Sequence, residues 1–134
     1  MRLIIFLLTT NFLYAASVDT VSILSKSMSK QVKNLVIIPE NYKNSKIAFA
    51  SVYLLHGAGG SYLDWNTKVP ALNQYCDSLN IIIICPDGGD NSWYFDSPVD
   101  SSFRYETYIT KELVNFIDNK YWTKKIQTLE QLVD

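Results

Sequence analysis

The stretch LLHGAGGSYLDW, residues 54–65, contains the residue types that most clearly suggest chemistry in this sequence. An apolar run ends at His56 and is followed by Gly57, Gly59 and Gly60. Glycine is used where the backbone turns sharply or approaches a ligand closely, because it has no Cβ. The pattern predicts either a loop that contacts a ligand or a glycine-rich turn between a strand and a helix.

Nucleophilic chemistry needs an activated Ser or Cys with a base within reach. The chain has one histidine, His56, and no Gly-x-Ser-x-Gly sequence. Cys76 and Cys85 have no His or basic neighbour in sequence that would activate a thiol. We expect these cysteines to be buried thiols, with a disulfide as the alternative, and we expect no catalytic or zinc-binding role for them.

Carboxylates occur in a second loop, which follows the apolar run Ile81–Cys85 and begins Pro86-Asp87-Gly88-Gly89. Asp87 and Asp90 could form a carboxylate pair or a metal site. The two glycines between them favour a turn instead.

The elements that must position these loops can be read from hydrophobic periodicity. Alternation within Thr20–Pro39 predicts an antiparallel hairpin, and continuous apolar runs predict strands buried on both faces. Residues at helical spacing predict two helices, the first with Pro70 in its first turn. The expected strands after the hairpin are Ile47–Leu55 and Ile81–Cys85, and the expected helices are Thr67–Leu79 and about Arg104–Tyr121.

This order of strands and helices predicts an α/β protein with a mostly parallel sheet. Ligands of such sheets bind outside the carboxyl ends of the strands, so both glycine-containing loops are expected at one edge. The length suits one domain. A net charge of −1 gives no basic excess for binding nucleic acid.

Residues 1–17 are expected to be a secretory signal peptide. Arg2 gives a positive start and Leu3–Leu8 is apolar. Small residues then offer cleavage after Ser17 or after Ala15. The apolar run is too short and too interrupted for a membrane span, and the alternative is a buried N-terminal strand or helix. We therefore expect a secreted or periplasmic protein, with no stable membrane span after removal of the leader.

Three blocks of the sequence resemble consecutive segments of one enzyme family. They are VYLLHGAGGSYLDW, IIIICPDGGDNSWYFDSPVD and YETYITKELVNFID, in order and at similar spacing. They are similar to the α/β-hydrolase esterases of the esterase D, feruloyl-esterase and tributyrin-esterase type, which are related to mycolyltransferases. The likeness covers residues 20–122. It implies the N-terminal portion of an α/β-hydrolase fold, in which an antiparallel hairpin leads into a parallel sheet with flanking helices.

The resemblance implies that the first loop supplies one backbone N–H to an oxyanion hole. The donor would be the amide of Ala58 or Gly57, with Gly59 and Gly60 keeping Cβ atoms away from the substrate carbonyl. By the same likeness, His56 holds the loop; its use as a general base is the weaker alternative. Further loop support is expected from Asp64 and Trp65.

The second loop is expected, again by resemblance, to shape the substrate pocket. The candidate residues are Asn91, Trp93, Tyr94, Phe95 and Asp96. For Trp93 the alternative is a hydrophobic plug that closes the top of the sheet. Glu106 beside Tyr105 matches a family pair, and a carboxylate in a first helical turn also suits the helix dipole, so its expected role is structural.

The residues that would complete catalysis are not found in the chain. By resemblance, the nucleophile, acid and base are expected beyond Asp134, so the domain is expected to span 18–123 and to be truncated before the nucleophile elbow. Residues 124–134 diverge from the family. With suitable synonymous codons, skipping two bases at Gln127 gives D-I-R-A-I-S-G-L, the run that leads into the elbow. We expect a frameshift near Lys124-Lys125 and an out-of-frame tail.

The function implied by this likeness is an exported serine carboxylic-ester hydrolase that uses Ser-His-Asp and an oxyanion hole. The chain would be an incomplete and inactive copy of such an enzyme. Its substrate would be a small-molecule or carbohydrate-linked ester, and no cofactor or metal is expected. One alternative is a small secreted non-catalytic binding module or remnant; another is an acyltransferase of the same fold. The sequence leaves the oligomeric state open.

Overall fold

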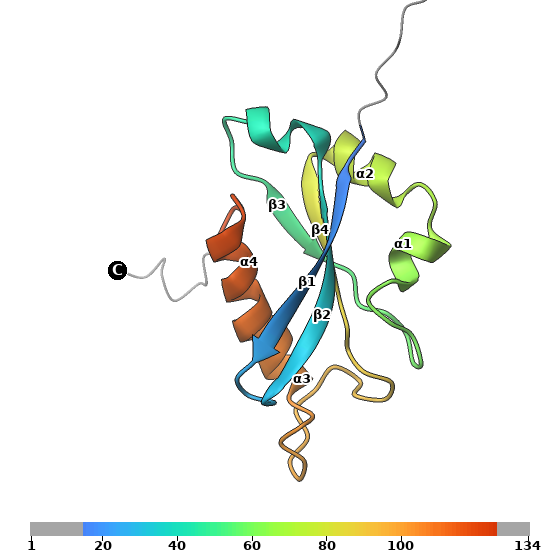
Figure 1. Ribbon diagram of the computed structural model, residues 1–134, viewed down its shortest axis with the longest axis vertical. Helices are drawn as coiled ribbons and strands as arrows, with labels where there is room; N and C mark the ends of the chain where they lie inside the picture. Colours follow the sequence, from blue (N-terminus) through green and yellow to red (C-terminus); the bar gives the residue numbers. More distant parts are fainter. Residues whose placement is uncertain (1–14, 126–134) are drawn as a thin grey trace, which may run out of the picture.

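A computed structural model describes residues 15–125, in which a four-stranded sheet lies between two layers of helices (Figure 1). The strands are β1 (Ser17–Ser25), β2 (Lys30–Ile38), β3 (Ala50–Tyr53) and β4 (Ile81–Pro86). They are ordered β1-β2-β4-β3 across the sheet. The β1–β2 hairpin is antiparallel, β2 also pairs antiparallel with β4, and β3 pairs parallel with β4.

Each face of the sheet is covered by helices that bury an apolar cluster. One face packs against the continuous helical segment α3 (Tyr105–Thr107), η2 (Tyr108–Leu113, a π-helical turn) and α4 (Val114–Lys120). The other packs against α2 (Leu72–Leu79), preceded by the short α1 (Asp64–Lys68) (Figure 1). A 3-10 turn, η1 (Glu40–Asn44), follows β2. Among residues 15–125, no helix has the length and apolar character of a membrane span.

The predicted hairpin, the second apolar strand and the C-terminal helix are present close to their expected bounds. The first predicted helix, Thr67–Leu79, is wrong in one respect, because the structure divides it into α1 and α2. The break falls at Val69, whose φ is −119° and ψ is 87°. A residue before proline is disfavoured in the helical region because it clashes with the proline ring, so Pro70 separates the helices.

The prediction that Ile47–Leu55 forms a strand buried on both faces is also wrong. The regular strand spans only Ala50–Tyr53, and these four residues are half-buried or exposed. The reason is position, because β3 pairs with β4 on one side and is the last strand of the described sheet. The chain after α4 returns to this open edge and forms one parallel bridge, between Phe49 and Thr123.

A buried polar pair joins the sheet to the helical layer. Asn34 of β2 is fully buried, and its amide exchanges hydrogen bonds of 2.7 and 3.0 Å with the Tyr108 hydroxyl. Burial raises the pKa of the Tyr108 hydroxyl well above its usual range, so it stays protonated and can donate. This pair fixes the register of η2 against β2.

Removing the Tyr108 hydroxyl is expected to destabilise the fold. Tyr108→Phe leaves the buried Asn34 Oδ1 without that donor, which costs about 1–3 kcal/mol. The measurement is the urea unfolding midpoint at low protein concentration. Tyr121→Phe is the matched control, since Tyr121 is also buried in this cluster but its hydroxyl makes no hydrogen bond among residues 15–125. An equal shift in both variants would contradict the role of the pair.

Candidate active site

The loops after β3 and β4 leave the same edge of the sheet and are hydrogen-bonded to each other. The Gly88 amide donates to His56 Nε2 at 2.9 Å, and the Tyr94 hydroxyl donates to the His56 carbonyl at 3.0 Å. The Gly59 amide donates to the Asp90 carbonyl at 3.1 Å. Parallel pairing of β3 and β4 therefore brings together two loops about thirty residues apart in sequence, as strand–helix–strand order requires.

His56 is the central residue of this junction, and its contacts define its protonation state. Nδ1 lies 2.8 Å from the Gly57 carbonyl, which can only accept, so Nδ1 carries the hydrogen. Nε2 accepts from the Gly88 amide, so it carries none. The ring is therefore neutral, 6% exposed and engaged at both nitrogens. In this arrangement it holds two loops together and has no free nitrogen to take a proton from a nucleophile.

The two loops enclose a cavity of about 200 Å³. Gly57 and Ala58 line it, and no hydrogen bond within residues 15–125 uses either of their amides. The other two glycine amides of the loop are occupied, Gly59 by Asp90 and Gly60 by the Gly57 carbonyl at 3.1 Å. Of the four amides, those of Gly57 and Ala58 are therefore the ones available to a ligand.

Asp64 and Trp65 brace the loop from the other side. The Asp64 carboxylate accepts from the amide and hydroxyl of Ser61, both at 3.2 Å, and it pairs with Lys68. The hydrogen bond from Lys68 is the largest cause that lowers the pKa of Asp64. The Trp65 indole donates to the Leu55 carbonyl at 2.9 Å. Both ends of the glycine loop are thus tied to α1.

Three of the predicted pocket residues, Asn91, Trp93 and Tyr94, line the cavity. Trp93 does not plug the sheet, because it is 78% exposed. Trp93 and Tyr94 have φ angles of 54° and 58°, a conformation that is rare for aromatic residues and costs about 1–3 kcal/mol. The bond from the Tyr94 hydroxyl to His56 helps to hold this backbone, and burial raises the pKa of Tyr94 to about 12.

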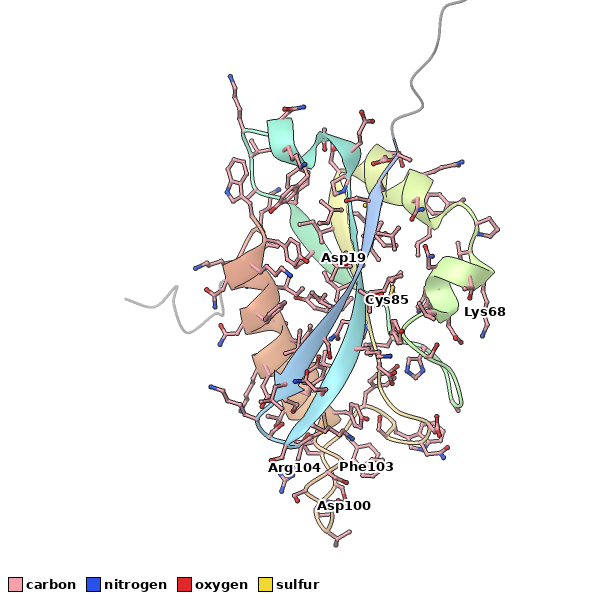
Figure 2. All side chains as sticks on the ribbon, viewed as in Figure 1. Asp19, Lys68, Cys85, Asp100, Phe103 and Arg104 are labelled. Carbon is pink, nitrogen blue, oxygen red and sulfur yellow. The ribbon has the colours of Figure 1, made fainter. Side chains whose placement is uncertain are left out.

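The other two predicted pocket residues, Phe95 and Asp96, do not line this cavity. The Asp96 carboxylate instead accepts from the Thr107 amide at 3.0 Å and the Thr107 hydroxyl at 2.6 Å, which lowers the pKa of Asp96. It holds the start of the helical segment. Phe95 is half exposed. The chain after Asp96 forms a loop, and its Asp100 and Phe103 lie at the lower end of the view in Figure 2.

Some lining residues were missed by sequence reasoning. Gly89, Asp90 and Ser92 line the cavity, and Gly88 supplies the amide that binds His56. The turn read from Asp87-Gly88-Gly89 is present, with the Gly89 amide donating to the Asp87 carboxylate at 2.9 Å. The sequence marked Gly88 only as part of a turn; the structure shows why glycine stands there, because a Cβ on it would lie 2.2 Å from the Tyr94 ring.

Cys76 of α2 and Cys85 of β4 are free and buried in the apolar cluster between α2 and the sheet. Figure 2 labels Cys85 on this side of the sheet. Burial raises the pKa of Cys76 to about 12 and that of Cys85 to about 11, so both remain thiols. Nucleophilic chemistry requires the thiolate. Within the described part of the chain, no group of three or more His, Cys, Asp or Glu side chains is placed to bind a metal.

Gly88→Ala is expected to separate the two loops. The added Cβ would overlap the Tyr94 ring and displace it from His56, which is an overpacking change that costs about 1–3 kcal/mol. The urea midpoint and the near-ultraviolet circular dichroism of the chain report the change. Gly57→Ala is the control, because nothing lies within 4 Å of a Cβ there. If the two variants unfold alike, packing at Gly88 is not what joins the loops.

A parallel β3–β4 pair, helices on both faces and a glycine loop at the carboxyl ends of the strands form part of an α/β fold with a ligand-binding edge. Residues 25–132 match the family model described as "Putative esterase", so the chain belongs to this esterase family. The matched range includes most of residues 124–134, the segment predicted to be an out-of-frame tail.

Individual relatives agree with this assignment. An esterase of Mycobacterium tuberculosis is 33% identical over 93 residues, which are 66% of this chain and 20% of that protein. A ferulic acid esterase structure has a TM-score of 0.67 at 24% identity, covering 82% of this chain and 46% of that one. An S-formylglutathione hydrolase from Agrobacterium tumefaciens has a TM-score of 0.72 at 15% identity, covering 87% and 48%. The chain therefore spans less than half the length of these proteins.

Proposed function

We propose that these residues form the oxyanion-binding half of an exported serine carboxylic-ester hydrolase. The observation that carries the proposal is the pair of unoccupied amides, Gly57 and Ala58, on a cavity whose walls are fixed by His56. Preorganised N–H donors stabilise the negative oxygen that develops on an ester carbonyl during acyl transfer. Esterase-family membership supports this chemistry.

The roles of the surrounding residues follow from their contacts. His56 joins the donor loop to the second loop, and Asp64 with Trp65 fixes the donor loop to α1. Trp93, at the exposed end of the cavity, is positioned to contact the acyl or alcohol group of a small-molecule or carbohydrate-linked ester. Each of these residues positions or binds substrate, and none of them supplies the attacking group.

The nucleophile, its base and its acid are proposed to be encoded beyond this chain or in another reading frame. The support is that the sequence contains no Gly-x-Ser-x-Gly and no histidine other than His56. The genomic DNA tests this directly. A frame that continues after Lys125 into a serine elbow, followed later by Asp and His, is expected; its absence would contradict the frameshift and leave the chain to be taken as it stands.

The donor role is tested in the complete protein by removing one N–H. Ala58→Pro deletes the amide and breaks no hydrogen bond among residues 15–125. Loss of one oxyanion donor is expected to lower kcat by about 10²–10³-fold with little change in KM. Ala58→Ser keeps the N–H and is the control. Unchanged kcat in Ala58→Pro would exclude Ala58, and the same result with Gly57→Pro would overturn the proposal.

A further inference from the structure

We propose that the protein is processed at the Ala15–Ala16 bond and that the new α-ammonium of Ala16 forms an ion pair with Asp77. This inference rests on the proposed export of the protein. Hydrolysis adds one water across the peptide bond, leaving a carboxylate on Ala15 and, after protonation, an ammonium on Ala16. The structure distinguishes this bond from the other predicted cleavage point, after Ser17, on three grounds.

The first ground is burial. Ala16 is 8% exposed and belongs to the apolar cluster on the face covered by α2, together with Ile37 and Cys76. Ala15, immediately before it, is exposed. Ser17 already pairs with Ile38 as the first residue of β1. Cleavage after Ser17 would remove a core side chain and the end of the hairpin, whereas cleavage after Ala15 removes neither.

The second ground is a polar contact at the nitrogen that cleavage would charge. The Ala16 amide donates to Asp77 Oδ2 at 3.0 Å, while Asp77 Oδ1 accepts from the Glu40 amide at 2.8 Å. Asp77 thereby joins the start of β1 to η1 and α2. Conversion of the amide into an ammonium places a full positive charge at this distance, and charge-assisted hydrogen bonds are about twice as strong as neutral ones.

The third ground is the position of Asp77 in its helix. Asp77 lies in the last turn of α2, where the Asn80 amide closes the helix on the Asp77 and Cys76 carbonyls. The C-terminal end of a helix carries partial negative charge, so a carboxylate is unfavourable there and a cation is favourable. An ammonium at Ala16 supplies that cation.

The cleavage motif by itself favours the bond after Ser17, because that choice puts small residues, Ala15 and Ser17, at both recognition positions. The three structural grounds favour the bond after Ala15 instead.

The experiment is to express the chain with its own leader in a secreting bacterial host and to determine the N-terminus by intact mass and Edman sequencing. Both measurements can be made on denatured protein. The expected N-terminus is Ala16. An N-terminus at Val18 would overturn this inference and leave the proposed export standing, whereas a retained Met1 in the cytoplasmic fraction would overturn the export itself.

A second measurement tests the ion pair. The exported protein is treated with an amine-acylating reagent at pH 7, and labelling of the Ala16 α-amine is followed by mass spectrometry. Because an ammonium held by a carboxylate is unreactive, labelling is expected to be about tenfold faster in Asp77→Asn than in the native protein. Asp19→Asn, an exposed carboxylate on β1, is the control. Equal rates in native protein and Asp77→Asn would overturn the pairing.

Discussion

The 134-residue chain, purified and tested on a short-chain nitrophenyl ester, is expected to hydrolyse it no faster than buffer does. An ester is attacked by an activated nucleophile, and the single histidine of the chain is held at both ring nitrogens by Gly57 and Gly88. Donors such as the Ala58 amide act only once something attacks the carbonyl. Enzymes accelerate such reactions by about 10⁶-fold or more, so an active esterase would be clearly distinguished from buffer.

The assay is an initial-rate comparison of the chain with a mock purification from the same host. Gly57→Val and His56→Asn variants serve as internal controls, because contaminating esterases are indifferent to them. Turnover above the mock level that both substitutions abolish would contradict the prediction. It would also require His56 to leave its bond with Gly88 and act as a base.

The protein is expected to associate through the open edge of β3. Most of it is expected to be in aggregates at concentrations where a protein without an open sheet edge would be monomeric. The Leu54 amide donates to the Ile84 carbonyl, so by alternation the amide of Val52 also faces β4. The amides of Ser51 and Tyr53 then face outward. Only Phe49 of this edge is paired within the described residues, by Trp122 and Lys124. Unpaired edge groups of this kind template addition of another strand.

Two proline variants separate this edge effect from general instability. Ser51→Pro removes an outward N–H and keeps the ladder with β4, so it is expected to leave most of the chain monomeric. Val52→Pro removes an N–H that faces β4, so it is expected to lower the free energy of unfolding and to leave the association unchanged. Sedimentation velocity over a concentration series measures the association of each variant, and the urea unfolding midpoint measures its stability. Monomeric native chain throughout the series, or identical behaviour of the two variants, would refute the edge mechanism.

The sequence alone was sufficient for the elements that depend on local pattern. Alternation predicted β1 and β2, a continuous apolar run predicted β4, and helical spacing predicted the segment from α3 to α4. All five glycines lie in two short stretches, and those stretches are the loops that meet at the cavity. These features are predictable because hydrophobic period and glycine placement act within a few residues of the chain.

Only the tertiary structure decided what those loops do. The Gly59 amide is occupied because it donates to the carbonyl of Asp90, which lies about thirty residues further along the chain. The rotation of Asp96 toward Thr107 and away from the cavity depends equally on a distant partner. The apolar run at β3 predicted full burial, yet burial requires a neighbouring strand, and the described sheet places none beyond it. Periodicity reports how a segment is built, whereas burial and hydrogen-bond occupancy are set by what packs against it.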